Sequence, residues 1–341
     1  MNKRVIVLLI AVFILTIKGL FWLSLGLALF SIINFVTFRL LSKLKLVVLK
    51  RTIKNIYIFI VILFVTISIK LFTFDIFRVP SSSMKNALFP NDVILVNKLK
   101  YGPRLSRSPF DIPFVNIACY FNENAKKRIK EYWWPYKRLS GTASIKQGDV
   151  IVFNSLWEKD FVLVKRCVAI AGDTLRIENG IVYINGEVFK VNTEKHKYKF
   201  EIKDKKTFRN TLNSLGLNHV NFIKSGEKHV LKSRLAQNEV DIIKNLKSVE
   251  NFQLILDTFK PDRKLLAKLP NKNWTYDNMG PFVIPKKGLQ IDLNNDNYLL
   301  YKQTINKFED ANLKYVDGKV YVDGKIASTY TFKKNYYFMM G

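Results

Sequence analysis

The first 75 residues contain long apolar runs that the rest of the chain lacks. Residues 19–38 carry no charged side chain, and residues 55–74 carry only Lys70, close to the end of the run. Each run is long enough to cross a hydrocarbon layer of about 30 Å as a helix, and a lysine near a helix end can reach the interface. The pattern predicts two transmembrane helices. Buried core helices are a weaker interpretation, because they seldom run so far without a polar face.

The segment between the two runs is basic and predicts an orientation. It contains no acid and the following cations: Arg39, Lys43, Lys45, Lys50, Arg51 and Lys54. Short loops of this kind stay in the cytoplasm, so we expect the residues after Asp75 to lie outside it. A cleavable signal peptide is disfavoured, because the second run would still hold the protein in the membrane. The shorter apolar run 5–17 is either an interfacial segment or an extension of the first span.

Beyond the second run, short apolar stretches bounded by turn residues predict a mainly β domain. Pro80 and the serines at 81–83 break the helical pattern, and residues 92–99 then read as a strand. Residues 150–153 follow a Gly-Asp turn as a buried strand, and residues 161–177 form a longer apolar stretch.

Two adjacent cations, Lys165 and Arg166, interrupt that last stretch. On a strand they point to opposite faces, so one cation enters the core if both faces are covered. Burial makes an unpaired ammonium costly and lowers a lysine pKa. A fall from about 10.4 to about 8 costs roughly 3 kcal/mol and leaves an amine that can take a proton from a serine hydroxyl. A lysine that reaches solvent from a barrel strand is the alternative that spacing alone leaves open.

Four dipeptides predict tight hairpin turns, because Asn-Gly and Asp-Gly suit left-handed turn positions and the flanking residues alternate. They lie at residues 179–180, 185–186, 317–318 and 323–324. The two groups are either partner hairpins of one extended ribbon or a small duplication. The lysine-rich residues 190–311 lie between them; within this stretch, residues 232–252 have helical spacing and residues 278–294 read as loop, strand and turn.

Composition narrows the class of function. The formal charge of +28 is spread over the whole chain, which carries no zinc-finger or RNA-binding signature, so an anionic membrane surface or a lysine-rich proteome explains it as well as nucleic acid does. Two cysteines, Cys119 and Cys167, make neither a disulfide framework nor a zinc site. The three histidines share one lysine-rich stretch: His196, His219 and His229. A mechanism based on a Ser-His pair or on a metal would have to draw its histidine from that stretch.

Three motifs together resemble the bacterial signal peptidase I family. Residues 80–84 (Pro-Ser-Ser-Ser-Met), directly after a predicted span, are similar to its nucleophile motif. Lys165-Arg166, with Gly-Asp at 172–173, resembles its lysine motif, and residues 147–153 (QGDVIVF) resemble the strand between them. Order, spacing and membrane context agree, so the joint signal is stronger than any single motif.

The resemblance implies a role for each residue of a site. Ser83 would be the nucleophile, Lys165 the general base, and the Ser81 hydroxyl with the Ser83 backbone N–H the oxyanion hole. The pockets for small substrate side chains would be lined by Phe77, Val79, Met84, Leu88 and Val164. No metal or cofactor is required. The implied partners are exported preproteins with their signal peptides, membrane lipid and the secretion translocon, with no nucleic acid. The implied location is the cytoplasmic (inner) membrane, with the catalytic domain on the extracytoplasmic side.

Some features depart from the family pattern. Ser82 replaces its usual Gly, and Asn86-Ala87 replace its usual Pro-Thr, which bears on substrate preference more than on activity. The run 336–341 (YYFMMG) resembles the lead-in to the family's Gly-Asp-Asn motif, with Gly341 as its first residue. We therefore expect the natural protein to continue past Gly341, and the 341-residue chain alone to be inactive or poorly folded.

The predicted fold is membrane-anchored and mainly β: transmembrane helices, then a signal-peptidase-like β-barrel or β-ribbon catalytic domain with an α/β insertion. The predicted divisions are an anchor (residues 1–75), a first part of the catalytic core (76–189), an insertion (190–311) and a return of the core (312–341). The predicted function is removal of signal peptides by a Ser-Lys serine endopeptidase. Two rivals are a non-catalytic membrane-tethered binding protein and a self-cleaving repressor, which would need a DNA-binding N-terminus in place of the apolar one.

Overall fold

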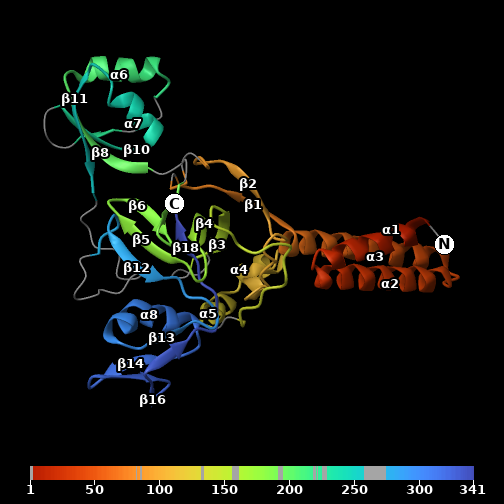
Figure 1. Cartoon of the computed structure of the whole chain (residues 1–341). Coiled ribbons are helices and arrows are strands. Elements are labelled where there is room, and N and C mark those ends of the chain that lie inside the picture. Colours follow the sequence, from red (N-terminus) through yellow and green to blue (C-terminus); the bar gives the residue numbers. More distant parts are fainter. Residues whose placement is uncertain are drawn as a thin grey trace. The chain divides into compact units, whose positions relative to one another are not determined.

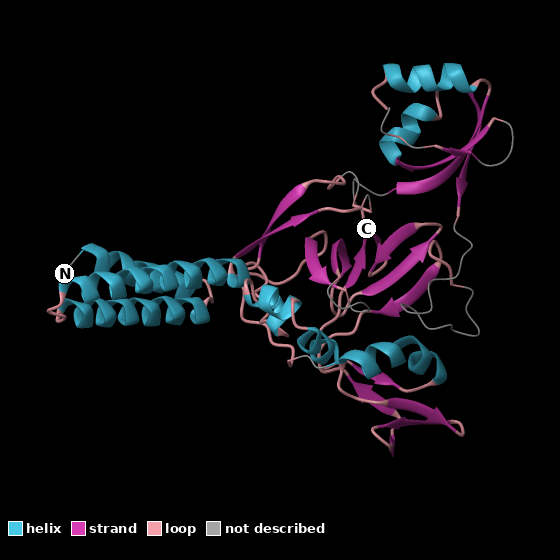
Figure 2. Cartoon of the chain, turned by 180° about the vertical axis from the view of Figure 1, so that it is seen from behind, coloured by secondary structure: helices cyan, strands magenta, loops and turns pink. Residues whose placement is uncertain are grey.

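A computed structural model describes residues 3–81, 83–84, 87–131, 134–155, 161–190, 195–217, 220, 222–224, 229–256 and 274–341 (Figures 1 and 2). The chain forms two compact units. The first contains residues 1–82 and 88–145, and the second contains residues 83–87 and 146–341.

Three helices begin the first unit and lie side by side in Figure 1: α1 (Lys3–Ile17), α2 (Phe21–Ser42) and α3 (Val47–Phe72). By length and composition α2 and α3 could each cross a membrane. No described residue of α3 is buried, which disfavours a soluble core helix and is what a helix facing lipid requires. The run 5–17 is a helix of its own, because Gly19 adopts φ +77° in the turn before α2. The interpretation of this run as an extension of the first span is therefore wrong.

The basic connection is shorter than predicted. Helix α2 continues to Ser42 and α3 already starts at Val47, so only residues 43–46 link them and most of the predicted loop is helical. Leucine and lysine are good helix formers and prolong both helices past the uncharged runs. The cations still gather at one end of the helix pair.

An antiparallel ribbon follows α3 directly. Strand β1 (Phe74–Arg78) pairs with β2 (Val93–Asn97), which agrees with the strand predicted there. Lys98 fixes the base of the ribbon, because its Nζ donates to the Lys70 carbonyl and to the Asp75 carboxylate, each at 2.8 Å. The rest of the first unit contains a short 3-10 turn, η1 (Pro109–Asp111), and the helices α4 (Val115–Tyr120) and α5 (Glu123–Glu131).

Two sheets in the second unit hold the predicted lysine motif. One has the order β18-β4-β3 and the other the order β12-β5-β6-β7. Their strands are β3 (Val150–Asn154), β4 (Val162–Ala169), β5 (Thr174–Glu178), β6 (Ile181–Ile184), β7 (Glu187–Val188), β12 (Met279–Val283) and β18 (Phe338–Met340). Val168, Leu175 and Phe282 belong to one buried apolar cluster that joins the two sheets. The predicted stretch 161–177 is thus two strands, β4 and β5, separated by a turn.

The predicted hairpin turns are confirmed. Each Asn or Asp adopts a left-handed φ before a glycine: Asn179, Asn185, Asp317 and Asp323. The later pair connects β14 (Leu313–Val316), β15 (Lys319–Val322) and β16 (Lys325–Ile326), which form a sheet of their own. Among the described strands the two hairpin groups do not pair, so the idea of one extended ribbon is wrong.

Helix α8 (Asn295–Phe308) packs with the sheet of β13 (Gln290–Asp292) and β17 (Thr329–Thr331) around a third apolar cluster. Glu309 follows α8 and is fully buried. Its carboxylate accepts hydrogen bonds from the backbone N–H groups of Lys333 and Lys334 and from the hydroxyls of Tyr330 and Tyr336. A buried carboxylate with this many donors fixes the turn that leads into β18.

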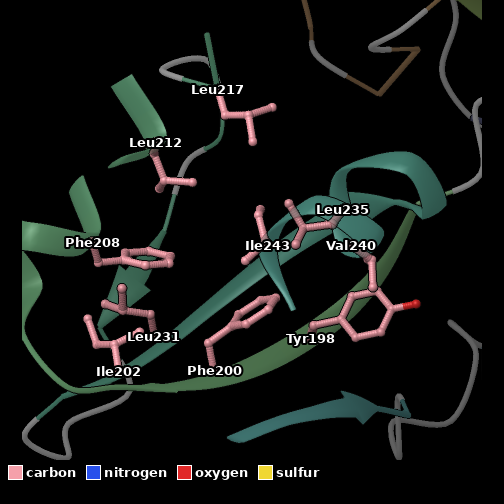
Figure 3. Close-up of a cluster of buried hydrophobic side chains, with 10 residues drawn as sticks. All are labelled: Tyr198, Phe200, Ile202, Phe208, Leu212, Leu217, Leu231, Leu235, Val240 and Ile243. Atoms are coloured by element: carbon pink, nitrogen blue, oxygen red, sulfur yellow. The ribbon is translucent and has the colours of Figure 1, made fainter. Parts of the chain in front are cut away.

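Residues 195–255 build an α/β body with its own core. Its elements are β8 (Lys195–Ile202), α6 (Lys205–Ser214), β9 (Ile223–Lys224), β10 (Val230–Ala236), α7 (Gln237–Ile243) and β11 (Val249–Ile255). The sheet order is β11-β8-β10-β9, and Figure 3 shows Phe200 of the sheet with Phe208 and Ile243 of the two helices in one buried cluster. The helix predicted over 232–252 is wrong except for α7, because residues 232–236 and 249–252 belong to β10 and β11, which pair with β8 on either side.

The described strands form six sheets, and none of these closes into a barrel. Apolar helices followed by antiparallel sheets agree with the predicted class, whereas the barrel is not found among the described strands.

Candidate active site

Ser83 and Lys165 meet within the second unit. Lys165 Nζ lies 2.8 Å from Ser83 Oγ, a normal hydrogen-bonding distance. Ser83 is exposed in a short turn, whereas the next residue, Met84, is buried and accepts a backbone hydrogen bond from Ala87. The apolar Met84 side chain therefore anchors the turn while the serine hydroxyl stays accessible.

Strand pairing determines where Lys165 emerges. It lies on β4, the central strand of its sheet, opposite Ile151 of β3. Backbone hydrogen bonds from Gly148 N to Cys167 O and from Cys167 N to Asp149 O fix the Gly-Asp turn before β3 against the same strand. The motif at 147–153 thus holds the lysine strand in register.

The two adjacent cations face different surroundings. Lys165 is partly buried, less than the sequence predicted, and desolvation lowers its pKa below the ordinary value of a lysine. Arg166 points to the other face of the strand and donates to the Gly148 carbonyl at 2.8 Å. Desolvation therefore favours the neutral form of the Lys165 amine.

Cys167 is fully buried two residues further along β4. Burial raises the pKa of its thiol to about 11, and the charges of Asp149 and Asp173 act in the same direction. The thiol therefore stays protonated near neutral pH, a form that is a poor nucleophile.

Gly341 packs against the lysine side chain. A Cβ on Gly341 would lie 2.5 Å from Lys165 Cδ and 2.7 Å from Lys165 Nζ. Strand β18, which ends one residue earlier, pairs with β4 at Met340 and Arg166. Because residue 341 has no side chain, the lysine can lie this close to the backbone, a role of Gly341 that its place in a motif alone did not reveal.

Asp173 links the motifs. Its carboxylate accepts from Gln147 Nε2 at 3.0 Å, Ile170 N at 2.8 Å and Asn185 Nδ2 at 2.9 Å. The turn after β4 is thereby tied to Gln147, three residues before β3, and to the hairpin turn at Asn185. Gln147 and Asp173 could each be read from the sequence as part of a motif. Their hydrogen bond could not be predicted, because residues 26 positions apart are not related by helical or strand periodicity.

The other predicted site residues are divided between the units. Met84 is buried and Val164 partly buried in the second unit. In the first unit Val79 is buried, Phe77 and Leu88 are partly buried, and Ser81 is exposed. Their roles at the oxyanion and in substrate pockets stay predictions. Ser82 and Asn86, which depart from the family pattern, lie outside the described residues, as does His219. Within the described part of the chain, no group of three or more His, Cys, Asp or Glu side chains could hold a metal ion.

A family profile matches more than half of this chain. The profile of the family described as "Signal peptidase, peptidase S26" matches residues 49–238. The chain belongs to this signal peptidase family. The matched region includes both Ser83 and Lys165, so the residues that the fold brings to 2.8 Å lie within the part that defines the family.

Individual signal peptidases resemble this family member over part of its length. Signal peptidase I of Rickettsia bellii is 26% identical over 129 residues, 38% of each chain. That of Pseudomonas aeruginosa is 30% identical over 131 residues, 38% of this chain and 37% of the relative. That of Buchnera aphidicola is 25% identical over 199 residues, 57% and 56% of the two chains. This signal peptidase family member therefore spans less than half the length of the Rickettsia bellii and Pseudomonas aeruginosa relatives and little more than half that of the Buchnera aphidicola relative.

Proposed function

We propose that the protein is a serine endopeptidase that removes signal peptides from exported preproteins through a Ser-Lys dyad. The observation that carries the proposal is the 2.8 Å separation of Lys165 Nζ and Ser83 Oγ, in a chain of the signal peptidase family. Separate support comes from the lowered pKa of Lys165, because a base must lose its proton before it can accept one.

The chemistry follows from these two groups. The neutral Lys165 amine takes the Ser83 hydroxyl proton as Oγ attacks the carbonyl carbon of the scissile bond. The tetrahedral intermediate places negative charge on the carbonyl oxygen, where the Ser83 N–H and the Ser81 hydroxyl donate. The Lys165 ammonium then protonates the leaving amine, and an ester between Ser83 and the signal peptide remains. Water, deprotonated by Lys165, hydrolyses the ester and regenerates Ser83.

Substrate selection would come from apolar pockets that accept small side chains. The residues that the family resemblance assigns to them are Phe77, Val79, Met84, Leu88 and Val164. We propose that the cut follows small residues of the preprotein, since large side chains would not enter such pockets. Neither a metal nor a cofactor takes part in this scheme.

Helices α2 and α3 would anchor the protein in the cell membrane, with the catalytic residues outside the cytoplasm. Support comes from their length and apolar composition and from the cations gathered at the α2–α3 connection. Preproteins reach that side during export, so the orientation would bring the scissile bond to Ser83. Membrane lipid and the secretion translocon would be the neighbours of such an enzyme.

The proposal is tested by preprotein cleavage with the full-length gene product. Ser83→Ala and Lys165→Ala should each abolish cleavage while the far-UV circular dichroism spectrum stays unchanged. Two exposed residues of the α/β body supply matched controls, Ser214→Ala and Lys244→Ala, which should cleave at the unaltered rate. Retained cleavage by Ser83→Ala would exclude the proposed nucleophile.

A further inference from the structure

The helices of the α/β body pack on one side of its sheet. Its elements follow the order β-α-β-β-α-β, a split βαβ arrangement. Figure 3 shows the covered side, where Phe200 of the sheet lies with Phe208 of α6 and Ile243 of α7 in the buried cluster. Side chains alternate along a strand, so the residues between the buried ones point to the opposite, open side of the sheet.

Four cations occupy the centre of this open side, which we call the basic face. They are Lys197 and Lys199 of β8 and Lys232 and Arg234 of the neighbouring strand β10. Lys197 and Arg234 are exposed, and the other two are partly buried. Glu201, two residues after Lys199 on the same strand, has its Oε1 atom 3.8 Å from the Lys199 Nζ atom. This one carboxylate balances one of the four positive charges.

The strand register sets like charges directly opposite each other. The pairs across β8 and β10 are Lys197 with Arg234 and Lys199 with Lys232. Like charges in this position destabilise a sheet. The basic composition of the chain does not force the arrangement, because Arg176 of β5 lies opposite Tyr183 of β6, with its guanidinium 4.7 Å from the ring centre. Two adjacent like-charge pairs therefore indicate a surface whose repulsion an anionic partner relieves.

The spacing of the cations indicates the form of that partner. Cβ atoms directly opposite each other on paired strands lie about 5 Å apart, and successive residues on one side of a strand lie about 6.5 to 7 Å apart. A carboxylate between the members of a cross-strand pair would contact both of them. An extended polypeptide points its side chains to one side at the same interval of about 6.5 to 7 Å. Acids at alternate positions of one extended segment would therefore match the two pairs.

A single-stranded nucleic acid is the other long anion that a four-stranded sheet can bind, and it does so by stacking its bases on aromatic side chains. The described residues around the four cations on this face are aliphatic or carry an amide: Ile223, Asn251, Gln253 and Ile255. Among them there is no ring on which a base could stack. The observations favour an acidic polypeptide.

We propose that the basic face binds an extended acidic segment of the exported preprotein, in which carboxylates at alternate positions bridge Lys197 to Arg234 and Lys199 to Lys232. This rests on the proposed function, under which the preprotein is the polypeptide delivered to this enzyme. The face adds affinity for preproteins that carry such a segment and leaves the chemistry at Ser83 unchanged.

The first test measures binding without catalysis. The full-length gene product carrying Ser83→Ala, in non-ionic detergent micelles, is titrated into a short fluorescent peptide in which glutamate alternates with threonine. Two double variants with the same change in charge are compared. Lys197→Gln with Arg234→Gln alters the basic face, and Lys205→Gln with Arg209→Gln alters exposed positions of α6 on the covered side. The variant of the face should fold, because it removes a destabilising pair of like charges.

Fluorescence anisotropy should give a Kd at least about fivefold higher for the variant of the face than for the α6 variant, because each exposed ion pair is worth up to about fivefold in affinity. A peptide with glutamine in place of glutamate should remove the difference. Equal affinities of the two variants, or no binding of the acidic peptide to the protein with an unaltered face, would overturn the proposal. Tighter binding of a single-stranded RNA through the same cations would also overturn it, in favour of a nucleic-acid partner.

The second test uses the protein with Ser83 intact and asks whether the preprotein is the partner. The KM for a preprotein with the Glu-Thr segment in its exported part should rise at least about fivefold in the variant of the face, with kcat unchanged. The KM for the matching preprotein with a Gln-Thr segment should not change. An unchanged KM for both preproteins would exclude the preprotein as the partner. Absence of cleavage by the unaltered protein would contradict the proposed function instead, and the peptide titration would still decide whether the face binds acidic polypeptide.

Discussion

Substitution of Gly341 by alanine tests how the position of the Lys165 amine affects catalysis, with little expected effect on the stability of the fold. The new Cβ would lie 2.5 Å from Lys165 Cδ, whereas an ordinary contact between carbon atoms is about 3.5 to 4.0 Å. The lysine side chain is the flexible partner in this contact, so it should withdraw by about 1 Å and leave the backbone nearly unchanged. The atom that moves is then the Lys165 amine, which the proposed mechanism uses as the base for Ser83.

A displacement of about 1 Å at a reacting group can reduce a rate about a hundredfold, which corresponds to about 2.7 kcal/mol of transition-state stabilisation. We expect Gly341→Ala to lower kcat by about this factor, with KM and the melting temperature almost unchanged. The assay is cleavage of a purified preprotein by the full-length enzyme in detergent micelles, with thermal unfolding followed in parallel.

Gly26→Ala is the matched control, because a Cβ on Gly26 meets nothing within 4 Å. This variant should retain the original kcat. If Gly341→Ala cleaves as fast as Gly26→Ala, the close approach to Lys165 has no catalytic consequence and the reasoning is refuted. A large fall in melting temperature would instead indicate that the backbone, and not the lysine, yields to the new side chain.

Three further predictions concern protonation, stability and topology. Because burial lowers the pKa of Lys165 and the neutral amine is the active form, kcat/KM should rise with pH through that lowered pKa; a profile that falls over this range excludes Lys165 as base. Glu309→Gln should lower the free energy of unfolding by about 3 kcal/mol, because buried N–H and O–H donors lose a charged acceptor, while the exposed Glu178→Gln should change it little in urea titrations. Alkaline phosphatase fused after Lys100 should be active in cells, and an inactive fusion would reverse the orientation.

Local sequence signals predicted much of this molecule. The uncharged runs correspond to α2 and α3, because length and composition alone determine whether a helix can span a membrane. The Asn-Gly and Asp-Gly turns were equally readable, since few other residues adopt left-handed φ without strain. The proximity of Ser83 and Lys165 was expected only from the family resemblance; periodicity could not have joined residues 82 positions apart.

Long-range pairing is where prediction from the sequence failed. Residues 232–252 have helical spacing, yet residues 232–236 and 249–252 form strands because β8 lies between β10 and β11 in the sheet and pairs with both. Tertiary pairing overrides local propensity in such short segments. The α/β body as a whole depends on contacts between elements that are far apart in the chain, and no local pattern encodes its order β11-β8-β10-β9.

Two details near the site depended on the fold in the same way. Nothing in the sequence distinguishes Glu309 from other acids, and only the fold surrounds it with the donors that fix the turn before β18. Gly341 matched a motif, but its reason for being glycine is visible only once β18 lies beside β4.

The most direct test of the Ser83–Lys165 dyad is to identify the acylated residue during turnover. The full-length enzyme is mixed with a signal-peptide ester substrate, quenched in acid after a few milliseconds, digested and analysed by mass spectrometry. The account predicts the added mass of the acyl group on Ser83, and its absence from Lys165→Ala under the same conditions. Cleavage that proceeds with no adduct on Ser83, or with the acyl group on another residue, would contradict it.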